Sequence, residues 1–130
     1  HGTRLEEDPD LLAYVNDHRI PLEICLSSNL QSCVVDSLDE HPFRSYLREG
    51  LRVTLNTDNT LFAQTSPWRE LRCAVDTYDL TLLETEQLLI NGFKSAFLPE
   101  KRKARLVGEA LATFASLRDK HSLDQLKAVR

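Results

Sequence analysis

The sequence lacks methionine altogether, has three cysteines among its 130 residues and contains no CxxC pair. An odd, scattered set of cysteines argues against a disulfide framework and against a cysteine-rich zinc site. It is typical of a reducing compartment, so we expect a cytoplasmic protein. Because the first residue is His1 and no Met is present, we expect a removed leader or a piece of a longer polypeptide.

Long apolar runs and a positive net charge are also missing. No stretch approaches the roughly 18 apolar residues of a membrane span, and residues 1–20 lack the pattern of a signal peptide. The formal net charge is −4, and the basic cluster at 101–105 has no interleaved aromatic residues. We therefore expect neither a membrane nor a nucleic acid as a partner, and interpret the basic cluster as a solvated helix face.

Turn residues and hydrophobic periodicity divide the chain into short alternating elements. Asp8-Pro9 is typical of a helix start, and Thr81 with Glu84 of a capping box. The pattern predicts helices at 9–18, 42–49, 67–78 and 81–90, a short helical piece at 93–97 and a last helix from 99, strands at 21–26 and 52–56, and polar loops at 27–40 and 57–66. The tail from about residue 121 is expected to be a further turn or a frayed end.

The two predicted strands are expected to run parallel. About 25 residues with one helix separate them, whereas a hairpin needs only a few. Each strand has an apolar face and a polar face, and the polar faces carry Glu23 and Cys25 in one strand and Asn56 and Asp58 in the other. One polar face suits a closed β/α barrel, in which chemistry occurs at the carboxyl ends of the strands.

Polar residues follow both predicted strands, and Asp58 is the strongest candidate among them. A carboxylate at a strand terminus suits a metal ligand or a base, although it could equally cap the following loop. Asn59 could donate its amide to a ligand or start a turn. Glu23 is expected to be paired in the barrel interior in a supporting role, and Cys25 lacks a histidine that would activate it.

Six motifs together resemble one known family: His1-Gly2 with Asp10-Leu11-Leu12, Pro21-Leu22-Glu23-Ile24-Cys25, Ser28-Asn29-Leu30-Gln31, His41-Pro42, Leu55-Asn56-Thr57-Asp58-Asn59, and Asn91-Gly92-Phe93-Lys94-Ser95-Ala96-Phe97-Leu98. In this order they resemble the C-terminal part of the adenosine deaminases. The resemblance implies an α/β fold, the C-terminal portion of a (β/α)8 TIM-type barrel. Residues 1–130 would form one fragment of a single barrel domain, holding its last two parallel strands and C-terminal helices.

The resemblance also implies a reaction and a role for each matching residue. The family hydrolyses adenosine and 2′-deoxyadenosine to inosine and 2′-deoxyinosine with release of ammonia, using a zinc-activated water. By this match Asp58 is the zinc ligand and a proton acceptor, and His1 is the catalytic histidine that orients and supports the attacking hydroxide. Asn59 stands where many members have an aspartate that contacts a purine ring nitrogen, and its amide is a suitable donor to that atom.

The sequence does not contain the rest of the family's zinc site. That site also needs a His-x-His pair and a third histidine from earlier strands, and a catalytic zinc takes about three protein ligands. The family's general acid, a glutamate near the third histidine, is also missing from this sequence. We therefore expect deamination of a purine nucleoside by a longer parent protein and an inactive isolated chain. The alternatives are a sibling deaminase acting on adenine or another 6-aminopurine, and a nucleoside-binding relative without turnover. The oligomeric state is not predicted.

Overall fold

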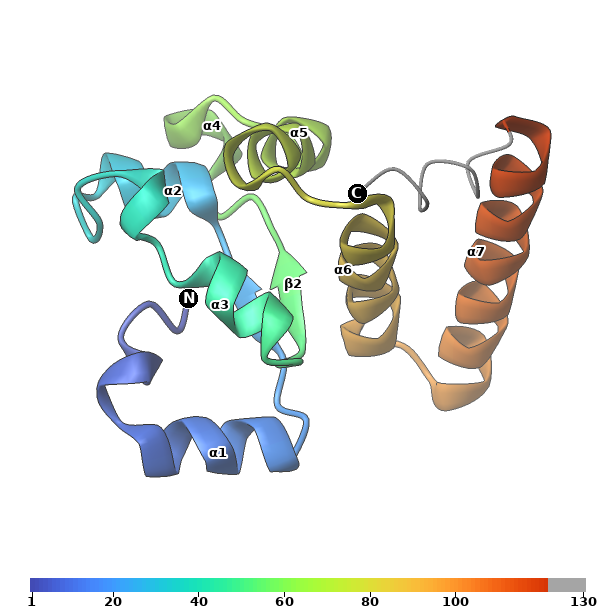
Figure 1. Ribbon diagram of the computed structural model, residues 1–130, viewed down its shortest axis with the longest axis horizontal. Helices are drawn as coiled ribbons and strands as arrows, with labels where there is room; N and C mark the ends of the chain where they lie inside the picture. The colour runs from blue at the N-terminus through green and yellow to red at the C-terminus, as the bar shows by residue number, and fades with distance from the viewer. Residues whose placement is uncertain (122–130) are drawn as a thin grey trace. The chain divides into compact units, whose positions relative to one another are not determined.

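The computed structural model describes residues 1–121, which divide into a unit of residues 1–92 and a segment that begins at Phe93 (Figure 1). The elements of the first unit are the 3-10 helices η1 (Leu5–Glu7) and η2 (Leu38–Glu40), the strands β1 (Leu22–Ile24) and β2 (Val53–Leu55), and the helices α1 (Pro9–Asp17), α2 (Leu26–Gln31), α3 (Phe43–Arg48), α4 (Thr60–Ala63) and α5 (Pro67–Tyr78). Helix α6 (Leu82–Ser95) begins in this unit, and α7 (Glu100–His121) follows it. The described chain is thus a helix-rich α/β protein.

The two strands pair in parallel, as their separation in sequence predicts. Leu22 pairs with Val53, and Ile24 pairs with Leu55. Both strands are shorter than the predicted 21–26 and 52–56, and Leu26, predicted as the end of the first strand, already belongs to α2. The ladder nevertheless continues by one bond beyond β2, where the backbone N–H of Asn56 donates to the Ile24 carbonyl at 2.8 Å.

The apolar face of the strands packs into the hydrophobic core, as the alternation of side chains predicts. Ile24 and Val53 are fully buried beside Phe43 of α3, and the ring of Phe43 lies 5.0 Å from that of Tyr78 in α5. Helices α3 and α5 both contact β2. This packing leaves the polar face of the strands, with Glu23, free for the candidate site.

The segments after the two strands differ from the sequence prediction. Residues 27–40 and 57–66 were expected as loops, but they contain the short helices α2 and α4 and the 3-10 helix η2. Serine and asparagine are common in turns, which made both segments resemble loops. Figure 1 shows α2, α4 and α5 gathered beyond the carboxyl end of the sheet, and α2 contacts both of the other helices.

Helix α6 is continuous through Asn91-Gly92, where the sequence predicted a break and a separate helical piece at 93–97. The buried Asn91 amide donates to the carbonyl of Val53 at 3.0 Å, so this residue ties the helix to β2 instead of ending it. The predicted last helix is present as α7, and the predicted tail beyond residue 121 lies outside the described residues. Within residues 1–121, no helix combines the length and the apolar character that crossing a bilayer requires.

Candidate functional site

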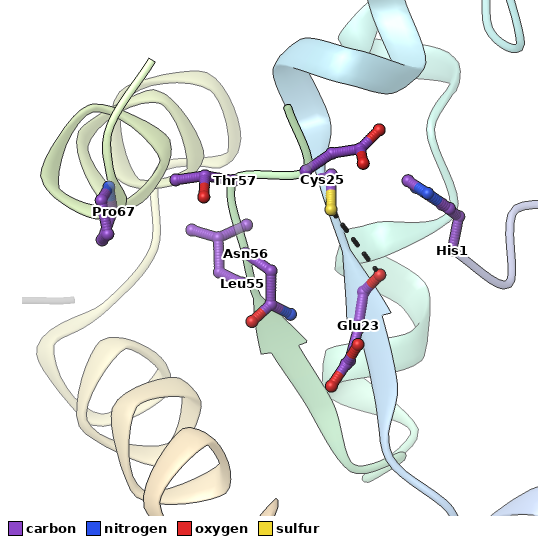
Figure 2. A pocket seen from close by; sticks show the side chains of 8 residues that line it. His1, Glu23, Cys25, Leu55, Asn56, Thr57 and Pro67 are labelled. Carbon is purple, nitrogen blue, oxygen red and sulfur yellow. Dashed lines mark hydrogen bonds between the residues drawn. The ribbon is translucent and has the colours of Figure 1, made fainter. Parts of the chain in front are cut away.

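A cavity of about 410 Å³ lies along the polar face of the two strands and reaches their carboxyl ends (Figure 2). Its walls come from the N-terminus, both strands, the loop after β2 and the start of α5, and the lining residues are His1, Glu23, Cys25, Leu55, Asn56, Thr57, Asp58 and Pro67. Figure 2 shows His1 and Pro67 on opposite sides of the strands. Two predicted site residues, His1 and Asp58, thus line one cavity although the sequence separates them widely.

Asp58 follows β2 and has an exposed side chain. The Ser28 hydroxyl, from α2 after the neighbouring strand, donates to Asp58 Oδ2 at 2.7 Å. This bond orients the carboxylate and commits one of its oxygens. The bond uses one lone pair of Oδ2, so the carboxylate still has acceptor sites for a metal ion or a proton.

Asn59 is the N-cap of α4, which confirms the interpretation that it starts a local turn of the chain. Its Oδ1 accepts from the backbone N–H groups of Leu61 and Phe62 at 3.1 and 3.0 Å. Capping uses the side-chain oxygen and leaves the Nδ2 hydrogens as donors. The predicted role as a donor to a purine therefore stays a prediction that is compatible with the cap.

The residues after His1 hold that histidine at the cavity. Gly2 has a φ of +70°, a conformation that favours glycine, and a Cβ at this position would lie 3.2 Å from a methyl carbon of Leu22. The Tyr46 hydroxyl donates to the Gly2 carbonyl at 3.1 Å and accepts from the Glu6 N–H at 2.9 Å. A buried tyrosine of α3 thus anchors the first turn of the chain.

Two residues near His1, Asn29 and His41, were not assigned to the site from the sequence. Asn29 contacts His1 directly, and His41 contacts Asn29. Asn29 of α2 lies with its Nδ2 3.1 Å from His1 Nδ1, and its Oδ1 lies 3.2 Å from Nε2 of His41. Asn29 and His41 are both buried, with 3% of their surface exposed. Both occur in the motifs that resemble the family, but their sequence positions gave no sign of contact with His1.

Cys25 and Glu23 also line the cavity. Burial, with contributions from Asp58 and Glu70, raises the pKa of the Cys25 thiol to about 11, so the thiol is protonated at neutral pH. This agrees with the prediction that Cys25 is no nucleophile. Glu23 is exposed in this chain, so the predicted pairing inside a closed barrel is not formed here and stays a prediction.

The described residues fit zinc only in part. Among residues 1–121, no group of three or more histidines, cysteines or carboxylates is placed to hold a metal ion. Asp58 offers one carboxylate oxygen at the cavity, which is suitable for a single ligand of a larger set. Any zinc site that includes Asp58 therefore needs further ligands from outside the described residues.

His1 and Asp58 line one cavity at two parallel strands, and many α/β enzymes have their active sites at the carboxyl ends of such strands. The family model described as adenosine deaminase matches residues 1–113. The chain belongs to the adenosine deaminase family.

Individual relatives agree with the family assignment. The chain is 37% identical to adenosine deaminase of Haemophilus ducreyi over 117 residues, which cover 90% of this chain and 34% of that protein. It is 37% identical to adenosine deaminase 1 of Streptomyces coelicolor over 122 residues, which cover 85% of this chain and 31% of that protein. The chain thus spans about a third of the length of the curated relatives it matches.

Solved structures share the fold. An adenine deaminase from Arthrobacter aurescens superposes with a TM-score of 0.81 at 29% identity, over 86% of this chain and 34% of that protein. An amidohydrolase from Burkholderia ambifaria, solved with bound zinc, superposes with a TM-score of 0.80 at 21% identity, over 92% of this chain and 34% of that protein. The second likeness, at that identity, shows the fold alone.

Proposed function

We propose that the polypeptide carrying this chain hydrolyses adenosine and 2′-deoxyadenosine to inosine and 2′-deoxyinosine, releasing ammonia. In this proposal the chain supplies the last two strands and the C-terminal helices of a (β/α)8 barrel. The observation that carries the proposal is that His1 and Asp58 line one cavity that lies along two parallel strands and reaches their carboxyl ends. Membership of the adenosine deaminase family and the placement of chemistry at the strand ends in such barrels support it.

A bound zinc ion would supply an activated water at neutral pH. Of the described residues, Asp58 would be the one to hold the ion, with ligands from outside residues 1–121 completing the set. The carboxylate also has a second use, because an ionised aspartate accepts a proton from a nearby water. Ser28 fixes the orientation of the Asp58 carboxylate for both purposes.

His1 would assist at the attacking oxygen. An imidazole N–H that donates to this oxygen would fix its position and stabilise the negative charge it carries once its proton has been removed, before it attacks the purine carbon. The amide of Asn59 would donate to a ring nitrogen of the purine, since its oxygen already caps α4. In the overall reaction, the nucleoside and one water molecule give the 6-oxo nucleoside and ammonia.

A sibling activity is the second candidate, because the Arthrobacter aurescens structure is described as an adenine deaminase. The small-molecule substrate would then be a free base or another 6-aminopurine derivative. A nucleoside-binding relative without turnover is the third. A cytoplasmic location and a small-molecule purine nucleoside as partner stay part of the proposal, as does the expectation that neither a nucleic acid nor a membrane is a partner.

The test uses the full polypeptide, purified with zinc, and measures ammonia release from adenosine, 2′-deoxyadenosine, adenine and an N6-substituted AMP. The proposal expects the highest kcat/KM for the two nucleosides. A preference for adenine or for the nucleotide would replace the proposed substrate with that compound. Tight binding of adenosine by calorimetry without ammonia release from any of the four would overturn the enzymatic proposal.

A further inference from the structure

A chain of hydrogen bonds runs from the body of the protein to the cavity through three side chains. It begins at the backbone N–H of Phe43, which donates to His41 Nδ1 at 3.0 Å. It continues from His41 Nε2 to Asn29 Oδ1 at 3.2 Å, and ends between Asn29 Nδ2 and His1 Nδ1 at 3.1 Å. The three residues come from different segments, since 28 positions separate His1 from Asn29 and 12 separate Asn29 from His41.

The first donor fixes the direction of every later bond. A backbone N–H can only donate, so His41 Nδ1 accepts and the proton of the neutral ring is on Nε2. That Nε2–H donates to the Asn29 oxygen, which places the Asn29 NH₂ group against His1. An NH₂ group only donates, so His1 Nδ1 must be the unprotonated nitrogen of that ring.

We propose that Asn29, oriented by His41, is a positioning residue that holds His1 in the tautomer with its proton on Nε2. This inference rests on the proposed function only for its catalytic consequence. Because Asn29 engages Nδ1, Nε2 is the ring nitrogen left for the cavity that His1 lines. The ring therefore presents an N–H donor to the oxygen that attacks the purine.

The surroundings suit a fixed arrangement. Asn29 and His41 are each 3% exposed, so water does not compete effectively for their polar atoms. Burial lowers the pKa of His41 to about 4, which keeps that ring neutral and leaves its Nδ1 free to accept. The Gly2 carbonyl accepts from the buried Tyr46 hydroxyl, which limits the movement of the backbone next to His1.

The experiment records ¹⁵N spectra of histidine side chains in the full polypeptide, labelled at both ring nitrogens, with and without zinc. A His1→Gln variant assigns the His1 signals, and a His41→Gln variant assigns those of His41. At pH 8, where a free imidazole is neutral, we expect both rings to be protonated on Nε2 and unprotonated on Nδ1. A His1 ring protonated on Nδ1 in the unaltered protein would overturn the proposal, whatever any variant does.

The decisive variant is Asn29→Asp, which has nearly the same shape but no N–H group. Its carboxylate can only accept, so His1 must become protonated on Nδ1, as a neutral or a cationic ring. His41 donates to the same position in both proteins and should keep its signals, which makes it an internal control. Asn16→Asp adds the same charge on the surface helix α1 and should leave the His1 signals unchanged.

Kinetics provide the second readout in the same proteins. Loss of a correctly protonated catalytic histidine lowers rates by about a hundredfold or more. We expect Asn29→Asp to lower kcat by about a hundredfold at pH 8 while KM changes by less than about threefold. Unaltered His1 signals and an unaltered kcat in this variant would overturn the proposal. If the unaltered polypeptide deaminates no purine, the proposed function fails, and the His1 signals still decide the tautomer.

Discussion

Ser28 Oγ donates to Asp58 Oδ2 at 2.7 Å, across the carboxyl ends of two parallel strands. The two residues are 30 positions apart; Ser28 lies in α2, the helix that follows β1, and Asp58 lies in the segment between β2 and α4. Parallel pairing brings these ends to the same edge of the sheet, so the hydrogen bond is a consequence of the topology. It turns an exposed carboxylate with several available rotamers into one with a preferred orientation.

We predict that Ser28→Ala in the full polypeptide lowers kcat/KM for adenosine by about tenfold and leaves zinc bound. A hydrogen bond to a charged group contributes about 1.5–3 kcal/mol when buried, and the exposure of Asp58 reduces this. Ser32→Ala is the matched control, because the Ser32 hydroxyl donates to the backbone carbonyls of Ser28 and Asn29 and not to the Asp58 carboxylate. Steady-state kinetics and metal analysis of both variants check the prediction; equal kcat/KM in the two would contradict it.

Glu70 of α5 explains why the sequence did not predict α2. This carboxylate is fully buried, and it accepts from the backbone N–H of Ser27 at 3.2 Å and from the Thr65 hydroxyl at 2.6 Å. Helix α2 has no side-chain cap of its own at Cys25, so a residue 43 positions away satisfies its first turn. The helix propensities of residues 26–31 do not reveal such a distant contact. The caps of α1 and α5, in contrast, come from residues next to each helix and were predictable.

We predict that Glu70→Ala lowers the free energy of unfolding of the polypeptide by about 2–4 kcal/mol. The substitution leaves a buried N–H and a hydroxyl without their acceptor, each costing about 1–3 kcal/mol. Glu70→Gln keeps one carbonyl oxygen and should cost less. Glu49→Ala, at an exposed position after α3, serves as control. Urea unfolding followed by circular dichroism measures the differences, and a Glu70→Ala protein as stable as the control would refute this role.

The fold and the site were predictable to different extents. The parallel pairing follows from the separation of the two strands in the sequence, and the core face follows from the alternation of apolar and polar residues. Most helix limits follow from capping residues and hydrophobic periodicity over one or two turns. The continuity of α6 was not predictable. Asparagine is common in turns, and here the side-chain amide of Asn91 donates to the Val53 carbonyl, a contact that is distant in the sequence. Likewise His1 and Asp58 follow from motifs, whereas the link from His1 through Asn29 to His41 exists only in three dimensions.

His41 makes stability depend on pH in a specific window. Burial lowers its pKa from 6.5 to about 4, so the unfolded chain takes up a proton near pH 6.5 and the folded chain only near pH 4. Between these values the unfolded state binds more protons, so the free energy of unfolding falls as the pH falls, by up to about 1.4 kcal/mol per unit. The contribution of neutral, buried His41 to the free energy of unfolding is therefore fully present above about pH 6.5 and is lost below about pH 4.

We predict that His41→Gln reduces the difference in Tm between pH 7.5 and pH 5, because the group that charges only on unfolding is removed. His18→Gln, which alters an exposed histidine after α1, should retain the full difference. Thermal unfolding of the three proteins at both pH values provides the measurement. Identical differences in all three would show that His41 does not titrate in this window.

The neighbouring residues Asp58 and Asn59 should respond differently to truncation. In the full polypeptide, Asp58→Ala removes the proposed zinc ligand and a proton acceptor together, so we expect loss of activity and weaker zinc binding. Asn59→Ala should leave zinc bound and lower kcat/KM by roughly tenfold to a hundredfold, the effect of about 1–3 kcal/mol from one lost hydrogen bond.

The cap at Asn59 requires a control, because Asn59→Ala also removes an acceptor from the first turn of α4. Asn59→Ser retains a capping oxygen but lacks the amide. If the amide contacts the purine, Asn59→Ser should lose as much kcat/KM as Asn59→Ala while keeping more stability. Recovery of activity in Asn59→Ser would assign the residue to capping alone. Full zinc and a near-normal rate in Asp58→Ala would remove Asp58 from the metal site.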